Sequence, residues 1–238
     1  MLSGRSIWLL FGGYVAVSLV GKLVFNGFSV WKRAQDMAAV AQELGFTFTP
    51  WTNDPKLVRG AETELFRNGW AGGVHNLMTG NYAGMDAEIM QYSSTTGNAG
   101  NSATSVQTVA IYTQNVDLPQ FMAQPGDLLL RVLDAIQHQK VDLDYPPGVS
   151  GHYAVHGPDK ERIRSLFNPD LISFIESLDR SKGWHIEGSG KKLVVYRYRG
   201  LVKPAKLRDF LQETSSIAQS FFSSQTQHPP LANGAAQG

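Results

Sequence analysis

The chain has 238 residues, of which 42% are hydrophobic and 17% are charged, so it is too apolar for a disordered protein and too polar for a multi-span membrane protein. It has 21 Lys and Arg residues against 20 Asp and Glu, a balance that gives no reason to expect a nucleic-acid partner. The sequence contains no cysteine, which excludes disulfides, thiolate metal sites and cysteine nucleophiles.

An apolar segment opens the chain. Residues Ser6 to Phe25 carry one charge, Lys22, and about 20 helical residues at about 1.5 Å each would cross a hydrocarbon core of about 30 Å. We therefore expect an N-terminal transmembrane helix, and a single-pass protein of the bacterial inner membrane whose partner is the lipid bilayer. A cleaved signal peptide and a buried core helix are the alternatives. More basic residues follow the segment than precede it, which favours a cytoplasmic soluble domain.

Helical and extended patterns alternate along the remaining chain. The helical spacing of apolar residues and the start signals predict helices over residues 30–44, 54–66 and 127–139, from 157, from 168, and over 204–222. Enrichment in β-forming residues predicts strands over 46–49, 74–80, 85–92, 106–116 and 151–156, and a hairpin with arms 184–187 and 192–197. The polar stretch 93–105 (SSTTGNAGNSATS) is expected to form a long mobile loop.

Together these patterns predict an α+β fold, with an N-terminal transmembrane helix followed by an antiparallel-sheet domain with flanking helices. The expected organisation is a membrane anchor over residues 1–27, a soluble α+β domain over 28–222 and a disordered tail over 223–238. The parts that begin near Phe46 and Gly151 follow the same order of elements. A pseudo-duplicated β-α-β-β-α unit is therefore one interpretation of the domain.

Several short phrases in the domain look familiar when taken in order behind an apolar helix. They are Glu43–Phe48, Asn76–Gly80, Gln107–Val109, Leu118–Phe121, Phe167–Pro169 and Leu193–Arg197. On these phrases the chain resembles a family of uncharacterised bacterial proteins that have one membrane span and one soluble domain. The resemblance covers residues 30–222. It implies an architecture and a membrane location, but no activity and no functional residues.

Candidate chemical motifs are weak. His152 and His156 lie in a predicted strand, where four residues span about 13 Å, too far for one metal ion to bridge. Asp142 and Asp144 alternate with apolar residues, which a solvated strand face explains. Neither a phosphate-binding loop nor a G-x-S-x-G turn occurs. We assign no catalytic residue, no cofactor-binding residue and no metal ligand, and we expect no cofactor.

The segment between Gly188 and Arg208 is basic and contains no acidic residue. We predict contact with anionic lipid headgroups by its basic side chains, namely Lys191, Lys192, Arg197, Arg199 and Lys203. A solvated hairpin edge that basic residues protect from aggregation is the alternative. A nucleic-acid partner is disfavoured because the segment lacks any recognition motif.

These observations favour a membrane-anchored, non-enzymatic binding or scaffold protein, whose protein partner the sequence does not identify. One alternative is a small-ligand or lipid-binding domain with a cavity between the sheet and the C-terminal helix. A deep apolar pocket with convergent polar groups would favour that alternative. The other alternative is an enzyme of unrecognised type, which buried acids or histidines with perturbed pKa values would favour.

Overall fold

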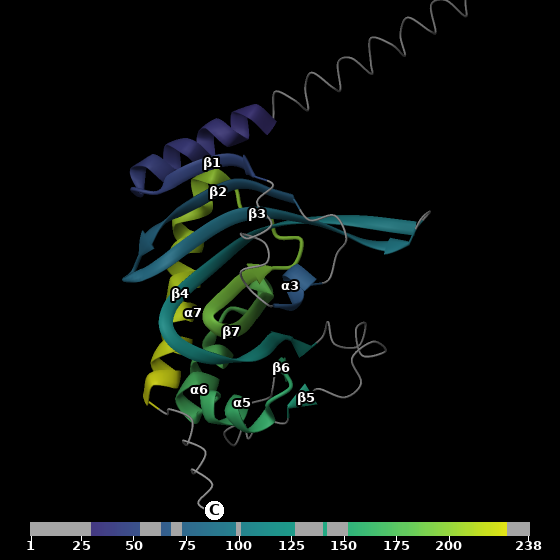
Figure 1. The fold of residues 1–238 in the computed structure, drawn as a ribbon, viewed down its shortest axis with the longest axis vertical. Helices are drawn as coiled ribbons and strands as arrows, with labels where there is room; N and C mark the ends of the chain where they lie inside the picture. Colours follow the sequence, from purple (N-terminus) through teal and green to yellow (C-terminus); the bar gives the residue numbers. More distant parts are fainter. Residues whose placement is uncertain are drawn as a thin grey trace, which may run out of the picture.

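The computed structural model describes residues 30–52, 63–67, 73–98, 101–126, 140–141 and 152–227 (Figure 1). A first helix covers residues 30–43. The elements that follow are β1 (Thr47–Thr52), α3 (Glu64–Arg67), β2 (Gly73–Tyr82), β3 (Met85–Asn98), β4 (Asn101–Pro125), β5 (Lys140–Val141), β6 (Tyr153–His156), α5 (Lys160–Leu166), α6 (Pro169–Ser177), η1 (Arg180–Lys182), β7 (Trp184–Arg197), η2 (Pro204–Lys206) and α7 (Leu207–Gln227).

The strands form one antiparallel sheet in the order β1-β2-β3-β4-β6-β5, and β7 also pairs with β4. Its centre is β4, which has 25 residues and pairs with β3, then β7, then β6 along its length. The β4–β7 register shifts between Thr113 and Leu118, and again before Phe121. At these shifts the sheet curls, and Figure 1 shows β4 bending around β7.

Glycine allows this curl in β7. Gly190 has a positive φ of 56°, a conformation that other residues adopt only with strain. A Cβ atom at Gly188 would lie 2.2 Å from the Phe121 ring on β4, so only hydrogen fits there. The sequence Gly-Ser-Gly therefore bends one continuous strand, and both of its arms pair with β4. The prediction of a hairpin over 184–197 is therefore wrong, because the segment is one strand. The interpretation of the domain as a pseudo-duplicated β-α-β-β-α unit is also wrong, because its second copy required this hairpin.

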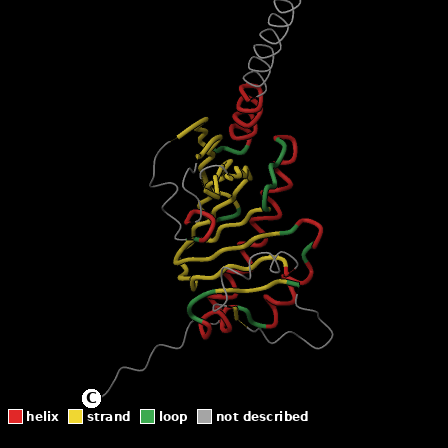
Figure 2. The backbone as a smooth tube through the Cα atoms, turned by 90° about the vertical axis from the view of Figure 1, so that its right-hand side faces the viewer, coloured by secondary structure: helices red, strands yellow, loops and turns green. Residues whose placement is uncertain are grey.

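The larger hydrophobic core lies between the sheet and the long helices. Figure 2 shows most of the strands on one side of the molecule and helices on the other. The rings of Phe121, Phe167 and Phe221 join β4, α5 and α7, with centroids 5.3 to 5.6 Å apart. Met37 and Ala41 of the first helix are fully buried in the same cluster. A fully buried side chain of the size of Met37 or Phe221 contributes about 1.5–3 kcal/mol by leaving water.

A smaller core lies on the opposite, concave face. It joins side chains of β2, β3, β4 and β7 to Leu65 of α3, and it includes Tyr92, Ile111 and Tyr196. Phe66 of α3 packs edge-on against Tyr92, with ring centroids 4.9 Å apart. The curled sheet therefore buries both of its faces, one under long helices and one under the short α3.

The transmembrane prediction requires correction. Its segment, Ser6 to Phe25, lies outside the described residues. Over the described ranges, where the first helix covers 30–43, no helix is long and apolar enough to cross a membrane. The 21-residue α7 carries exposed or half-exposed polar residues such as Asp209 and Glu213 on one side and packs its other side on the core. The single-pass architecture is therefore wrong for the described chain, and the inner-membrane location inferred from it is withdrawn.

Two local predictions also change. The stretch 93–105 is not a loop over its described part, because β3 and β4 continue as a paired ribbon to Asn98 and Asn101. Matching hydroxyls, such as Ser94 with Ser105 at 3.1 Å, replace the apolar cross-strand contacts that usually mark a strand. The last helix continues to Gln227, past the Phe222 end expected from its apolar face.

Candidate functional site

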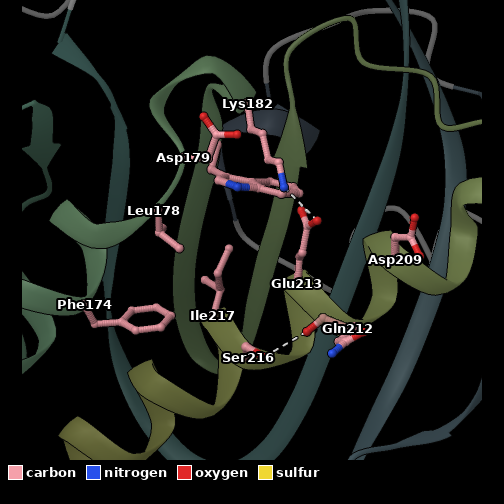
Figure 3. A pocket seen from close by; sticks show the side chains of 10 residues that line it. Phe174, Leu178, Asp179, Lys182, Asp209, Gln212, Glu213, Ser216 and Ile217 are labelled. Atoms are coloured by element: carbon pink, nitrogen blue, oxygen red, sulfur yellow. Dashed lines mark hydrogen bonds and ion pairs between the residues drawn. The ribbon is translucent and has the colours of Figure 1, made fainter.

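A hollow of about 440 Å³ lies between the α6–η1 segment and α7 (Figure 3). Such a volume falls within the range of about 300–1,000 Å³ that small-molecule sites occupy. The hollow is lined by Phe174, Leu178, Asp179, Lys182, Trp184, Asp209, Gln212, Glu213, Ser216 and Ile217.

The connection between α6 and β7 builds one wall of the hollow. Asp179 caps η1, and its carboxylate accepts hydrogen bonds from the backbone N–H of Ser181 at 3.0 Å and its hydroxyl at 2.7 Å. These bonds lower the pKa of Asp179, which is therefore ionised at neutral pH. Gly183 then ends η1 with φ +57°, which turns the chain into β7 and places Trp184 at the hollow.

The hollow separates ionised from apolar groups. At one side Lys182 Nζ lies 2.7 Å from Glu213 Oε1, so an ion pair joins η1 to α7 (Figure 3). Phe174, Leu178 and Ile217 form the apolar part. The Trp184 ring is 1% exposed, and the Arg197 guanidinium stacks 5.1 Å from its centroid. A site of this kind suits an amphipathic molecule, with an apolar part inside and a polar part at the rim.

The concave face holds a buried polar network. Glu187, which is 1% exposed, accepts hydrogen bonds from the Tyr196 hydroxyl at 2.7 Å and from the Leu65 backbone N–H at 3.1 Å. Burial raises the pKa of Glu187 despite these bonds, and burial together with Glu187 raises the pKa of Tyr196 well above its usual value. The carboxyl group thus ties α3 to β7.

His185 completes the network by stacking on Tyr196, with ring centroids 5.0 Å apart. Burial lowers the pKa of His185 to about 4, so the imidazole is neutral at physiological pH. A neutral histidine next to a buried carboxyl group is a pattern that acid–base catalysis uses. Here, however, Glu187 already accepts hydrogen bonds from Tyr196 and from α3, and we assign it no reaction.

The basic residues singled out from the sequence are spread along β7 and the loop after it. Lys191 is exposed at the bend, and Lys192 lies 3.7 Å from Glu88 of β3. Arg197 is held between the Trp184 and Phe210 rings. Arg199 and Lys203 are exposed beyond the end of the strand. The bend and the strand end are thus separate places, and the contact of these residues with anionic lipid stays a prediction.

His152, one of the candidate histidines, contacts Glu176 of α6. His152 Nε2 lies 3.7 Å from Glu176 Oε2, and the backbone N–H of His152 donates to the same carboxylate at 3.1 Å. Asp142 and Asp144 lie outside the described residues. Within the described ranges, no group of three or more His, Asp or Glu side chains is placed to hold a metal ion.

The sequence did not identify Lys182, Trp184 or Glu213 as site residues. Lys182 and Trp184 lie close together in the chain but far from Glu213 on α7, and each of the three taken alone has an ordinary explanation as a turn, core or surface residue. The sequence contained one indirect signal. The apolar face of the last helix predicted that this helix packs against the rest of the domain, and a cavity between the helix and the sheet was one of the hypotheses.

No protein-family model matches the chain, and no curated protein matches it. Among solved structures, the chain is similar to the crystal structure of the mycobacterial trehalose monomycolate transport factor A, TtfA. The TM-score is 0.59 and the sequence identity is 12%, and the match covers 84% of this chain and 98% of that chain. At this identity the likeness shows that the two chains share a fold.

Proposed function

We propose that the chain is a lipid-associated, non-enzymatic binding or scaffold domain, and that the hollow beside α7 takes the apolar part of an amphipathic molecule. The observation that carries the proposal is the hollow itself, where Phe174, Leu178 and Ile217 lie next to the Lys182–Glu213 ion pair. The fold supports the lipid class, because it extends over nearly the whole length of a protein described as a trehalose monomycolate transport factor.

The proposal is tested with a fluorescent single-chain phospholipid, used below its critical micelle concentration. The full chain should bind it saturably, with one molecule per chain. Ser216 lines the hollow from an exposed position on α7, so Ser216→Trp fills the hollow without disturbing the core. We expect this variant to bind the probe at least about tenfold more weakly, which corresponds to about 1.4 kcal/mol.

Gln219→Trp is the matched control, because Gln219 is exposed on the same helix but does not line the hollow. The control should bind like the unaltered chain, and both variants should keep its melting temperature within a few degrees. If the unaltered chain shows no saturable binding, or if the two tryptophan variants lose binding equally, the hollow is not a lipid site.

A further inference from the structure

The most exposed large apolar side chains of the described residues come from four different parts of the chain. They are Val30 and Trp31 at the start of the first helix, Trp51 on β1, Val106 on β4, and Tyr198 and Leu201 after β7. Trp31, Trp51 and Tyr198 are 58%, 55% and 50% exposed, which is unusual for aromatic rings in a domain with two filled cores.

The sheet register brings the β1 and β4 residues of this set together at the end where β1 finishes and β2 begins, beyond which the β3–β4 ribbon continues to Asn98 and Asn101. Trp51 pairs with His75, His75 with Gln91, and Gln91 with Thr108, so one row crosses β1, β2, β3 and β4. At the usual spacing of about 4.8 Å between strands, the row is about 14 Å wide. Val106 lies two residues from Thr108 on β4.

The loop after β7 is fixed to the β4 end of this row. The Thr108 backbone N–H donates to the Gly200 carbonyl at 2.9 Å, and the Thr108 hydroxyl accepts from the Val202 N–H at 2.9 Å. Arg199 has a positive φ of 55°, and its backbone N–H donates to the Gln107 side chain at 3.3 Å. These bonds hold the segment between the exposed Tyr198 and Leu201 side chains against β4.

The first helix reaches the same place through Arg33. Its guanidinium donates to the Val202 carbonyl oxygen, so the helix start lies next to the loop. Arg33 is one turn from Val30, which places the exposed helix start on the same end as the loop. In Figure 1 this helix runs along that end of the sheet beside β1.

The two segments that meet here, residues 30–33 and 198–203, carry charges of one sign. Lys32, Arg199 and Lys203 are exposed there, and neither residues 30–33 nor residues 198–203 include an acid. Aromatic rings that alternate with basic residues match the interface of an anionic bilayer, where Trp and Tyr sit at headgroup level and cations meet lipid phosphates. The core of a protein–protein interface, by contrast, is depleted of lysine.

We propose that this end, hereafter the docking end, rests on the surface of a bilayer that contains anionic lipid, with Trp31, Tyr198 and Leu201 entering the headgroup layer. Of the basic residues predicted from the sequence to contact lipid, Arg199 and Lys203 belong to the docking end, whereas Lys191 and Lys192 lie outside it. It shares no residue with the lining of the hollow beside α7, so the Ser216→Trp experiment tests a different property.

Position-specific labels in the full chain test the proposal. The chain has no cysteine, so Leu201→Cys and Lys191→Cys each accept one environment-sensitive fluorophore. Lys192 pairs with Thr113, five residues along β4 from Thr108, so the two labels are about 16 Å apart or more. With vesicles of anionic and zwitterionic phospholipid at low salt, the label at 201 should shift to the blue and the label at 191 should not.

Paired charge variants give the second measurement. Arg199→Gln with Lys203→Gln should raise the vesicle concentration needed for the shift at 201 about 30-fold, because each basic residue near an anionic surface is worth about 1 kcal/mol. Lys191→Gln with Lys192→Gln removes the same charge at the bend and should change little. High salt should reverse the shift, since the Debye length falls from about 30 Å at 0.01 M to about 3 Å at 1 M.

Three outcomes would overturn the proposal. They are a label at 201 that stays in water with every vesicle, a shift that is equal with purely zwitterionic vesicles, and equal effects of the two charge variants. The first outcome would mean that the docking end does not contact a bilayer and that a protein partner covers it instead. The second would mean that apolar contact alone drives adsorption, and the third that net charge acts without a defined site.

Discussion

Two buried side chains on one strand respond to pH in opposite ways. Both His185 and Glu187 prefer the neutral form because burial penalises charge. For His185, the unfolded chain binds more protons below pH 6.5, so stability falls as the pH drops from 6.5 towards about 4. For Glu187, the folded chain binds more protons above pH 4.5, so stability falls as the pH rises through the raised pKa. The two effects oppose each other at mildly acidic pH.

Replacement of His185 by phenylalanine isolates the first effect. The substitution keeps the ring stack on Tyr196 and removes the titrating group. We expect His185→Phe to resist acid better, by about 3 kcal/mol at pH 4, because the pKa is lowered from 6.5 to about 4. Urea denaturation of both proteins between pH 4 and 7 measures this difference. If the difference in unfolding free energy between the two proteins is the same at pH 4 and at pH 7, His185 is accessible to water and its pKa is not lowered by burial.

Replacement of Glu187 by glutamine isolates the opposite effect. Glu187→Gln keeps an oxygen that can accept the Leu65 N–H while removing the buried charge. The variant should lose the decline in stability that the acid causes above pH 4.5 and should equal or exceed the unaltered chain at neutral pH. Glu187→Leu, which leaves the Tyr196 hydroxyl and the Leu65 N–H without their acceptor, should be destabilised instead. If the stability of Glu187→Gln depends on pH more steeply than that of the unaltered chain, the pKa of Glu187 is not raised in the folded state.

At the scale of elements, the local signal at Asn168 predicted a helix start correctly, whereas the path of the strands was predicted less well. Asn168 caps α6 with Pro169 in its first turn, as the Asn-Pro sequence predicted, because capping depends only on neighbouring residues. The sequence Gly-Ser-Gly at residues 188–190 predicts a hairpin over 184–197, because such a sequence also forms turns. Only the tertiary pairing of both arms with β4 decides between a turn and a bend.

The bend in β7 makes Gly188 sensitive to the addition of a single methyl group. In Gly188→Ala the new Cβ would lie 2.2 Å from the Phe121 ring, which itself is packed against Phe167 and Phe221. We expect a loss of about 1–3 kcal/mol, as for other overpacked cores. Ser189→Ala, at a half-buried position in the same bend, should cost less than about 0.5 kcal/mol. Similar melting temperatures for the two variants would show that Phe121 moves freely.

At the scale of the whole molecule, the sequence predicted the α+β class of the described chain, because strands of β-branched residues and amphipathic helices each leave a periodic pattern. It missed the curl of the sheet and the hollow, which depend on contacts between distant elements such as Lys182 with Glu213. It also led to an incorrect single-pass architecture: the apolar segment Ser6 to Phe25 lies outside the described residues, and within them no helix is long and apolar enough to cross a membrane. Polar cross-strand pairs such as Thr95 with Thr104 were read as a loop because they bury no apolar surface.

Arg33 joins the first helix to the loop after β7 and to Gln91 of β3, and its removal should affect stability and adsorption together. Its guanidinium donates to the Val202 carbonyl, and the Gln91 amide oxygen, turned toward it, lies 2.7 Å from Nε and 2.8 Å from Nη2. Arg33→Met keeps most of the packing but leaves the Val202 carbonyl without this donor, which should cost about 1–3 kcal/mol.

Arg33→Lys tests geometry at constant charge, because a lysine cannot reproduce the planar fork that reaches both acceptors. We expect Arg33→Lys to be destabilised nearly as much as Arg33→Met in urea denaturation. The fluorophore at position 201 should then respond to anionic vesicles less sharply in both variants, since the loop is no longer fixed against the helix. If Arg33→Lys restores both stability and the fluorescence shift, the role of Arg33 is that of a simple positive charge at the bilayer, and the first helix and the loop after β7 are held together by other contacts.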